Sequence, residues 1–477
     1  EVPALNIAYV QQLNKKTGID LQLKTCTIAG MGRSYDTNQS GQRLPEESPH
    51  KKIWAIAFPA ILANSSAPLV GLVDTWAIGH LPEAVHLAAV GLGSVIFSYL
   101  LWAFGFLRMG TTGLIAQAKG RNDLNDQVVT VIRSSGLALF FGLLLFVFQE
   151  ALLAASLKAM APPDNVASIA SEYFRIRIWA APFTLLGYAI TGVLFGLARV
   201  RTILWLQLLL NTTNGILNVT FVVGLGMGVP GVALGTLIAQ VLTAIVSLWM
   251  MLRIFGMTPL LAALRDGGTW VLSGFRKLVL VNGFIFIRTI FLMTALALIM
   301  RVAASLGEVA MAASHVMNQY MLLIALGLDG FAHASEALAG AAWGRSDRAQ
   351  FRRWVYLTGY WSLIASMAYS LMFWLWGNDI TDLLTDIESV QITAAELLTL
   401  VIALPVVSVW CYLFDGVYIG ATAAASMMVT MGVAFVIYVF LLEPMTEQWG
   451  LHGLWGAVCL LYTSPSPRDP LRYLVCR

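Results

Sequence analysis

Charged residues are scarce in this 477-residue chain: they make up 12% of it, about half the share found in soluble domains. Hydrophobic residues make up 58%, and the mean hydropathy is +0.75. Most of the chain is therefore expected to lie in lipid. The net charge of +3 gives no reason to expect a nucleic-acid partner.

Cysteine and histidine are also scarce. The four cysteines are scattered without a CxxC pair, which argues against a disulfide framework and a metal site. None of the six histidines is paired at a three- or four-residue spacing on an apolar segment. An intramembrane transferase, which needs clustered acids or histidines, is therefore a remote alternative. We expect neither an enzyme nor a cofactor.

Apolar stretches of the about 20 residues that a membrane helix needs recur along the chain. They lie near 53–79, 86–110, 127–152, 168–198, 202–225, 229–254, 278–303, 309–340, 354–376, 391–420 and 424–442, and a twelfth begins near 451. Alternate connections are basic, and the positive-inside rule places these, with the N-terminus, in the cytoplasm. The pattern predicts an all-α protein of twelve transmembrane helices.

Both ends of the chain look foreign. Residues 1–50 are polar and lack the features of a signal peptide, and Met31 is a plausible true start. Near the other end, Pro465 and Arg468 interrupt the twelfth span early, and proline and charge both stop a membrane helix. The run "CLLYTSPSPRD" resembles a translated sequencing adapter. We expect residues 459–477 to be an artefact and the last helix to be truncated.

An internal repeat relates the two halves. At a shift of 224 residues, "TTGLIAQAKGRND" (111–123) matches "SEALAGAAWGRSD" (335–347), and Gly192 matches Gly416. Because each half has six spans, both halves begin on the same side of the membrane. This predicts a parallel repeat of the kind found in secondary transporters. The predicted parts are an N-lobe (51–256), a cytoplasmic linker (257–277) and a C-lobe (278–458).

Asp74 is the one acid of the apolar run "NSSAPLVGLVDTWAIGHL" (64–81). It lies 22 residues beyond Lys52, or about 33 Å along a helix, towards the outer side. It is either an interfacial acid that reaches water or a protonatable group that faces an outward cavity. Pro59 and Pro68 interrupt the same helix, and a kink at Pro59 is either purely structural or a hinge operated from Asp74.

The fifth span carries Asn211, Asn214 and Asn218 on one helical face. Thr236 enters the next span at a similar depth. These side chains either join helices by hydrogen bonds or line a cavity. Both interpretations stay open for Asn211, and a cavity is favoured for Asn214 and Asn218.

The second half lacks the acid, because the shift of 224 places Leu298 at the position of Asp74. Any asymmetric ion coupling therefore belongs to the first half. The second half has its own polar candidates, of which Asp415 is favoured over Glu336. These candidates are Asp329, Glu336, Asp415, His315 and Arg288.

Five segments together resemble the multidrug and toxic compound extrusion family, with the bacterial DinF-type group as the closest branch. They are "PLVGLVDTWAIGHL", "FGFLRMGTTGLIAQAKG", "NTTNGILNVTFVVGLGMGVPGVALGT", "GLDGFAHASEALAGAAWG" and "LFDGVYIGAT". The resemblance covers about residues 50–458 and implies a two-lobed antiporter that expels organic compounds in exchange for H⁺ or Na⁺. It implies that Asp74 is the protonation or cation site and that the helix bends at Pro59.

The family's fifth helix carries an asparagine and then an aspartate at the positions of Asn214 and Asn218, so the second carboxylate is absent here. This departure favours H⁺. The resemblance implies a bacterial inner-membrane protein with a cytoplasmic N-terminus and a small organic substrate. We expect a monomer. A flippase of lipid-linked substrates is the nearest alternative, and it would favour a basic central cavity, for which Arg288 is the obvious deep cation.

Overall fold

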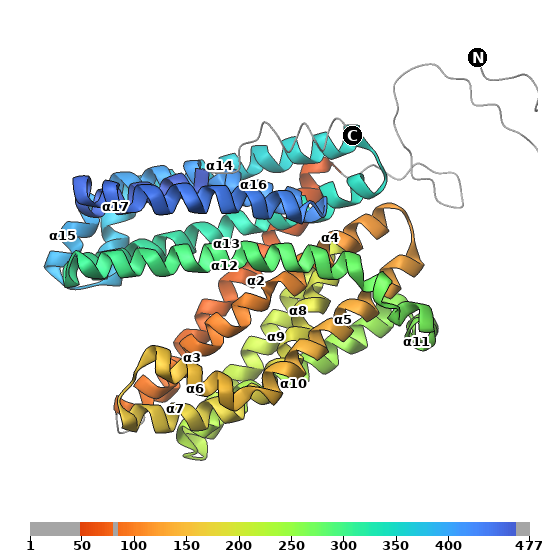
Figure 1. Cartoon of the computed structure of the whole chain (residues 1–477), viewed down its shortest axis with the longest axis horizontal. Helices are drawn as coiled ribbons and strands as arrows, with labels where there is room; N and C mark the ends of the chain where they lie inside the picture. Colours follow the sequence, from red (N-terminus) through yellow and green to blue (C-terminus); the bar gives the residue numbers. More distant parts are fainter. Residues whose placement is uncertain (1–47, 80–83, 464–477) are drawn as a thin grey trace, which may run out of the picture. The chain divides into compact units, whose positions relative to one another are not determined.

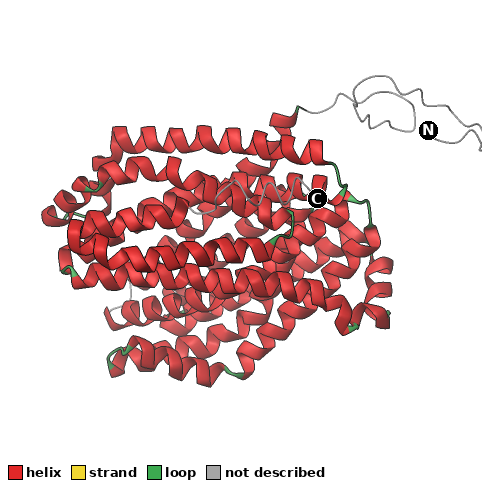
Figure 2. Cartoon of the chain, turned by 45° about the horizontal axis from the view of Figure 1, so that its top comes forward, coloured by secondary structure: helices red, strands yellow, loops and turns green. Residues whose placement is uncertain are grey.

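The computed structural model describes residues 48–79 and 84–463, and the side chains of 48–66 and 85–462. These residues form helices joined by short connections, without strands (Figure 2). The predicted residues Asp74 and Pro68 lie on described helical backbone, but their side chains lie outside the described part. The proposed artefact 459–477 is described only as far as residue 463, where the last helix ends.

The first half folds into one group of helices (Figure 1). They are α2 (Pro49–Gly79), α3 (Ala84–Trp102), α4 (Phe106–Gly120), α5 (Leu124–Val147), α6 (Gln149–Met160), α7 (Asp164–Arg177), α8 (Ala181–Gly196), α9 (Val200–Asn218) and α10 (Gly228–Phe255). Short 3₁₀ turns join α3 to α4 and α7 to α8, and a π-helical segment, Val219–Gly224, follows α9. The predicted linker contains α11 (Met257–Arg265) and a 3₁₀ turn, Gly267–Trp270.

The second half folds into the other group, drawn in green to blue in Figure 1. Its helices are α12 (Leu272–Ser305), α13 (Glu308–Gly344), α14 (Arg348–Leu384), α15 (Glu388–Glu396), α16 (Leu398–Gly420) and α17 (Ala424–Thr463). The backbone of α17 leaves helical geometry at Gly450, where φ is +56° and ψ is −131°. A Cβ on Gly453 would lie 1.8 Å from the carbonyl oxygen of Met445, so the chain folds back there and starts a twelfth helix.

Nine segments of the described chain are long and apolar enough to cross a bilayer. α2 and α14, of 31 and 37 residues, exceed the required length, and the helix after Gly450 is the twelfth. The second span differs from its predicted range, 86–110, because α4 continues to Gly120. Small residues and threonines let this last part pack closely inside the protein, so its modest hydropathy does not end the helix.

The repeat is visible in the geometry of two turns. Asn122 and Ser346, 224 residues apart, both have left-handed φ values, of 56° and 59°. The residue after each is the N-cap of the next helix: Asp123 accepts from the backbone N–H of Asp126, as Asp347 accepts from that of Gln350. A second pair of turns repeats at the same shift, since φ is 57° at Ala198 and 53° at Thr422.

The halves also meet through reciprocal contacts between α4 and α13. A Cβ on Gly120 would lie 2.1 Å from the carbonyl oxygen of Ala341, and one on Gly344 would lie 2.2 Å from that of Gln117. Each of these contacts is the other one shifted by 224 residues. Such reciprocity is the mark of a two-fold relation, and helices that point the same way in both halves place the axis along them. The predicted parallel repeat is therefore confirmed.

The contacts between the lobes lie in the helix halves that adjoin the basic connections. Gln117 Nε2 donates to the Gly420 carbonyl across 3.0 Å, three residues from the end of α4. At the start of α2, the His50 Nδ1 accepts from Trp361 Nε1 across 3.0 Å. The lobes are thus joined at the end of the bundle that carries the basic connections.

Candidate functional site

Polar side chains form a ladder between α9 and α10 in the N-lobe. Asn214 Nδ2 donates to Thr236 Oγ1 across 3.0 Å, and Asn218 Nδ2 donates to Asn214 Oδ1 across 3.4 Å. Asn218 is fully buried and Asn214 nearly so. The structure therefore brings the three predicted residues together, with the amide and hydroxyl groups bonded to one another.

Asn211 connects this ladder to α2. Its Nδ2 donates to Ser66 Oγ across 2.9 Å, which fixes the register of two helices that run in the same direction. Asp74 lies eight residues beyond Ser66, about 12 Å up α2, and Asn218 lies seven residues beyond Asn211, about 10 Å up α9. The helix backbone therefore places Asp74 at the height of Asn218.

The surroundings of Asn218 leave it little freedom. A Cβ on Gly235 of α10 would lie 2.2 Å from Asn218 Oδ1, so α10 can approach this amide only because residue 235 is a glycine. The π-helical segment begins at the next residue, Val219. Single π turns inside helices are frequent at functional sites.

Pro59 lies where α2 contacts the other lobe. α2 is helical through this position, although proline removes a backbone hydrogen bond. Gly330 of α13 packs here: a Cβ on it would lie 2.5 Å from the Ile61 side chain and 2.9 Å from the Ala57 carbonyl oxygen. Bending α2 at Pro59 would therefore change a contact between the lobes.

The predicted polar residues of the C-lobe divide into groups. Arg288 of α12 and Asp415 of α16 form an ion pair, in which the arginine side chain is 8% exposed and the aspartate side chain 24%. Asp329 has no ion pair within the described residues but lies within electrostatic range of both Arg288 and Glu336. His315 lies apart, with its Nε2 3.4 Å from Gln319 Nε2.

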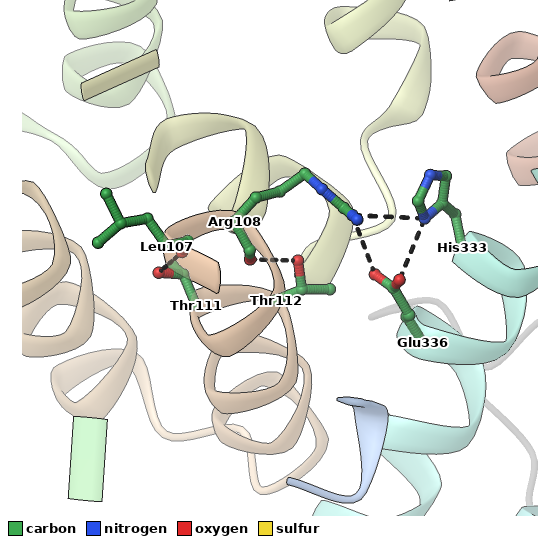
Figure 3. Close-up of polar contacts among 6 residues, drawn as sticks. All are labelled: Leu107, Arg108, Thr111, Thr112, His333 and Glu336. Carbon is green, nitrogen blue, oxygen red and sulfur yellow. Dashed lines mark hydrogen bonds and ion pairs between the residues drawn. The ribbon is translucent and has the colours of Figure 1, made fainter. Parts of the chain in front are cut away.

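Glu336 takes part in a contact between the lobes (Figure 3). Its Oε2 lies 3.5 Å from Arg108 Nη1 of α4, and its Oε1 lies 3.2 Å from His333 Nδ1. Arg108 and His333 were not predicted from the sequence. Arg108 carried the available signal, because it is a lone cation in the apolar run "FGFLRMG".

Arg177 is a second cation that the sequence analysis missed. Its Nη1 lies 2.5 Å from the Tyr173 hydroxyl, and its guanidinium lies 4.8 Å from the centre of the Phe97 ring. It also lines a cavity of about 20 Å³ that Thr236 shares. No described group of acids, histidines and cysteines has the arrangement of a metal site.

Comparisons with known proteins agree with this architecture. The MatE family model matches residues 59–220 and again 285–444, so the second match begins 226 residues after the first and ends 224 after it. DNA damage-inducible protein F of Escherichia coli (strain K12) is 35% identical over 418 residues, which cover 86% of this chain and 89% of that protein. Protein DETOXIFICATION 44, chloroplastic, of Arabidopsis thaliana is 26% identical over 86% of this chain and 79% of that protein.

Solved structures show the same fold. A crystal structure of MATE in the bent conformation superimposes with a TM-score of 0.77 at 20% identity, covering 87% of this chain and 92% of that one. A MOP superfamily transporter from Pyrococcus furiosus gives a TM-score of 0.74 at 20% identity, over 87% and 93% of the two chains. The chain belongs to the MatE family and is a multi-pass membrane transporter, not an enzyme.

Proposed function

We propose that this transporter is an antiporter, which exports organic and often cationic or amphiphilic compounds in exchange for H⁺ and couples the two at Asp74. The observation that carries the proposal is the register set by Asn211 and Ser66. This register supports a position of Asp74 on α2 at about the height of Asn218 on α9. A single carboxylate can be neutralised by a proton without the ligand set that a metal ion requires.

The coupling ion is H⁺ and not Na⁺ in this proposal. Na⁺ is a hard cation that favours several oxygen ligands. Position 218 offers an amide where the family pattern has a carboxylate. Asn214 already donates to Thr236, and Asn218 donates to Asn214. One acid and a bonded amide ladder fit proton uptake better than cation coordination.

The transport cycle follows from alternating access. Open to the outside, Asp74 takes a proton as the exported compound leaves. The neutral acid lets α2 bend at Pro59, where α2 contacts Gly330 of the other lobe, and the path opens to the inside. One charge moving through 100 mV supplies about 2.3 kcal/mol, which sustains a gradient of about 50-fold.

We also propose a bacterial inner membrane and a cytoplasmic position for the basic connections. The positive-inside rule supports both the orientation and the side assigned to these connections. The lobes are joined at that end, so the conformation described here is closed towards the cytoplasm.

The runner-up is a flippase for lipid-linked substrates, which needs a basic cavity for anionic head groups. The deep cations Arg288 and Arg108 are paired with Asp415 and Glu336. Because these pairs neutralise the charge that such a substrate would use, the antiporter is preferred.

The test is Asp74→Asn in proteoliposomes with a pH gradient and a fluorescent cationic dye. We expect normal expression and a loss of proton-driven export of at least about tenfold, corresponding to 1.4 kcal/mol or more. Asp379→Asn, at an exposed acid of α14, is the matched control and should transport normally. Wild-type transport by Asp74→Asn would refute the assignment.

A further inference from the structure

The interlobe triad, made of Arg108, His333 and Glu336, joins the two lobes deep in their contact region (Figure 3). Arg108 belongs to α4 of the N-lobe, whereas His333 and Glu336 belong to α13 of the C-lobe. Arg108 lies about 18 Å from the end of its helix and Glu336 about 12 Å from the end of its own. The triad therefore lies on the membrane side of the small-residue contacts at Gly120 and Gly344.

The Arg108–Glu336 contact is loose for a buried ion pair. The arginine side chain is 20% exposed and the glutamate side chain 2% exposed, and the two charged groups are 3.5 Å apart. Glu336 Oε2 accepts no hydrogen bond of ordinary geometry from any described residue. A long ion contact with one partly exposed member can break at low cost, as a contact that is remade in every transport cycle must.

The two neighbours of His333 Nδ1 have opposite hydrogen-bonding requirements. Its Nδ1 lies 3.5 Å from Arg108 Nη1, which can only donate, and 3.2 Å from Glu336 Oε1, which can only accept when ionised. A neutral ring with a bare Nδ1 can accept from Arg108. A protonated ring donates to Glu336 and turns an N–H towards the guanidinium, so it competes with Arg108 for the carboxylate.

The packing of the ring holds it in this shared position. The Phe195 ring of α8 lies 4.1 Å from the centre of the His333 ring and also lies under the Arg108 guanidinium. The charged groups within electrostatic range are Arg108 on α4, Asp329 and Glu336 on α13, and the Arg288–Asp415 pair of α12 and α16. α8 contributes an aromatic surface here and no charge.

The neighbouring part of the interface also favours separation. Asn282 of α12 is 3% exposed and packs against Gly110 of α4, where a Cβ would lie 1.9 Å from Asn282 Oδ1. Neither polar atom of this amide has a hydrogen-bond partner among the described residues. Because water would satisfy the amide once the lobes part, the closed state gains less here than its close packing suggests.

We propose that the interlobe triad closes the transport path at the basic end, and that a proton on His333 opens it by weakening the Arg108–Glu336 pair. Glu336 and Arg108 are the gate residues, and His333 is the residue through which a proton acts on them. The proposal rests on alternating access but not on Asp74 as the coupling site.

The first experiment measures the distance between the lobes without substrate or gradient. Spin labels on Asn125→Cys of α5 and Ala349→Cys of α14, both exposed, report the separation at the basic end by pulsed electron resonance. The full chain is used in lipid nanodiscs with its native cysteines replaced by alanine. We expect one short distance for the otherwise unchanged chain at pH 8.

Glu336→Gln keeps the size of the side chain and removes its charge. It should add a longer distance and change the open-to-closed ratio by about tenfold. Arg108→Gln should do the same, and it provides the test if Glu336→Gln does not fold. The swap Arg108→Glu with Glu336→Arg should restore the short distance. Glu150→Gln, which breaks an ion pair with Arg175 inside the N-lobe, is the control and should change nothing.

The second experiment tests His333. Lowering the pH from 8 to 5 should lengthen the distance in the unmutated triad. His333→Phe, which keeps a ring against Phe195, should respond less, with only the part of the opening that a proton on Asp74 drives. An unchanged distance in both Glu336→Gln and Arg108→Gln would overturn the gate. A full pH response in His333→Phe would overturn the role of the histidine. Neither outcome changes the conclusion that the Asp74→Asn transport assay would support about Asp74.

Discussion

The two lobes share a fold but differ in their buried polar groups, which are neutral in one lobe and charged in the other. In the N-lobe, Asn211, Asn214, Asn218 and Thr236 are neutral and bond to one another or to Ser66. In the C-lobe, the ion pair of Arg288 and Asp415 occupies the interior. The N-lobe groups are therefore held by neutral hydrogen bonds, and the C-lobe groups by opposite charges.

The difference shows that the repeat preserved backbone geometry and not chemistry. The turns at Asn122 and Ser346 match in φ and in capping, while position 74 carries an acid in one lobe and its counterpart, Leu298, is apolar. We therefore expect changes in the C-lobe pair to act first on stability and changes in the N-lobe ladder to act first on coupling.

The largest expected effect on stability comes from breaking the C-lobe pair. Arg288→Met or Asp415→Leu alone leaves a charge without its partner and should cost about 3 kcal/mol, at the low end for buried pairs because Asp415 is partly exposed. The double variant should recover most of the loss in thermal unfolding and should keep proton-driven export. A stable double variant that had lost proton coupling would show that the lobes share the coupling role.

An intermediate effect is expected from Gly235→Ala in the N-lobe. The added methyl group would lie 2.2 Å from Asn218 Oδ1, so it must displace the amide, at a cost of about 1–3 kcal/mol. The pH dependence of export should shift with it. Gly187→Ala in α8, where a Cβ meets nothing within 4 Å, is the control. An unshifted pH profile in Gly235→Ala would remove Asn218 from the coupling site.

The smallest effect is expected from Ser66→Ala, which removes the bond between α2 and α9. Hydrogen bonds between membrane helices contribute about 0.6 kcal/mol on average, so the melting temperature should fall by about 1–2 °C. Ser65→Ala, on the same helix and without a side-chain bond among the described residues, should leave it unchanged. Equal effects of the two changes would mean that this bond does not set the register.

Sequence reasoning predicted the features that depend on local pattern. Apolar length gave the spans, and matching small residues such as Gly120 and Gly344 gave the repeat, because close helix packing requires them at fixed spacing. The face of Asn211, Asn214 and Asn218 followed from helical periodicity. The end of α4 was predicted wrongly, since its small polar residues look like a connection when their tertiary packing is unknown.

Partners that lie far apart in the sequence could not be predicted, because no local pattern links them. Arg288 and Asp415 were each singled out, but the 127 residues between them conceal that they are partners. Two of the three members of the interlobe triad, Arg108 and His333, were missed for the same reason, since they are 225 residues apart.

The reciprocal contacts of Gly120 with Ala341 and of Gly344 with Gln117 are those of a homodimer, in which each patch meets its own copy. In two identical chains, an arginine that met a glutamate across the axis would have to appear twice. Here, at the shift of 224, Ala332 is the counterpart of Arg108, and Thr112 is the counterpart of Glu336. The second pair is therefore uncharged. Covalent fusion of the halves is what permits one salt link instead of two. A two-fold related interface therefore carries one charged contact on one side of its axis, whereas two identical subunits would carry it on both sides.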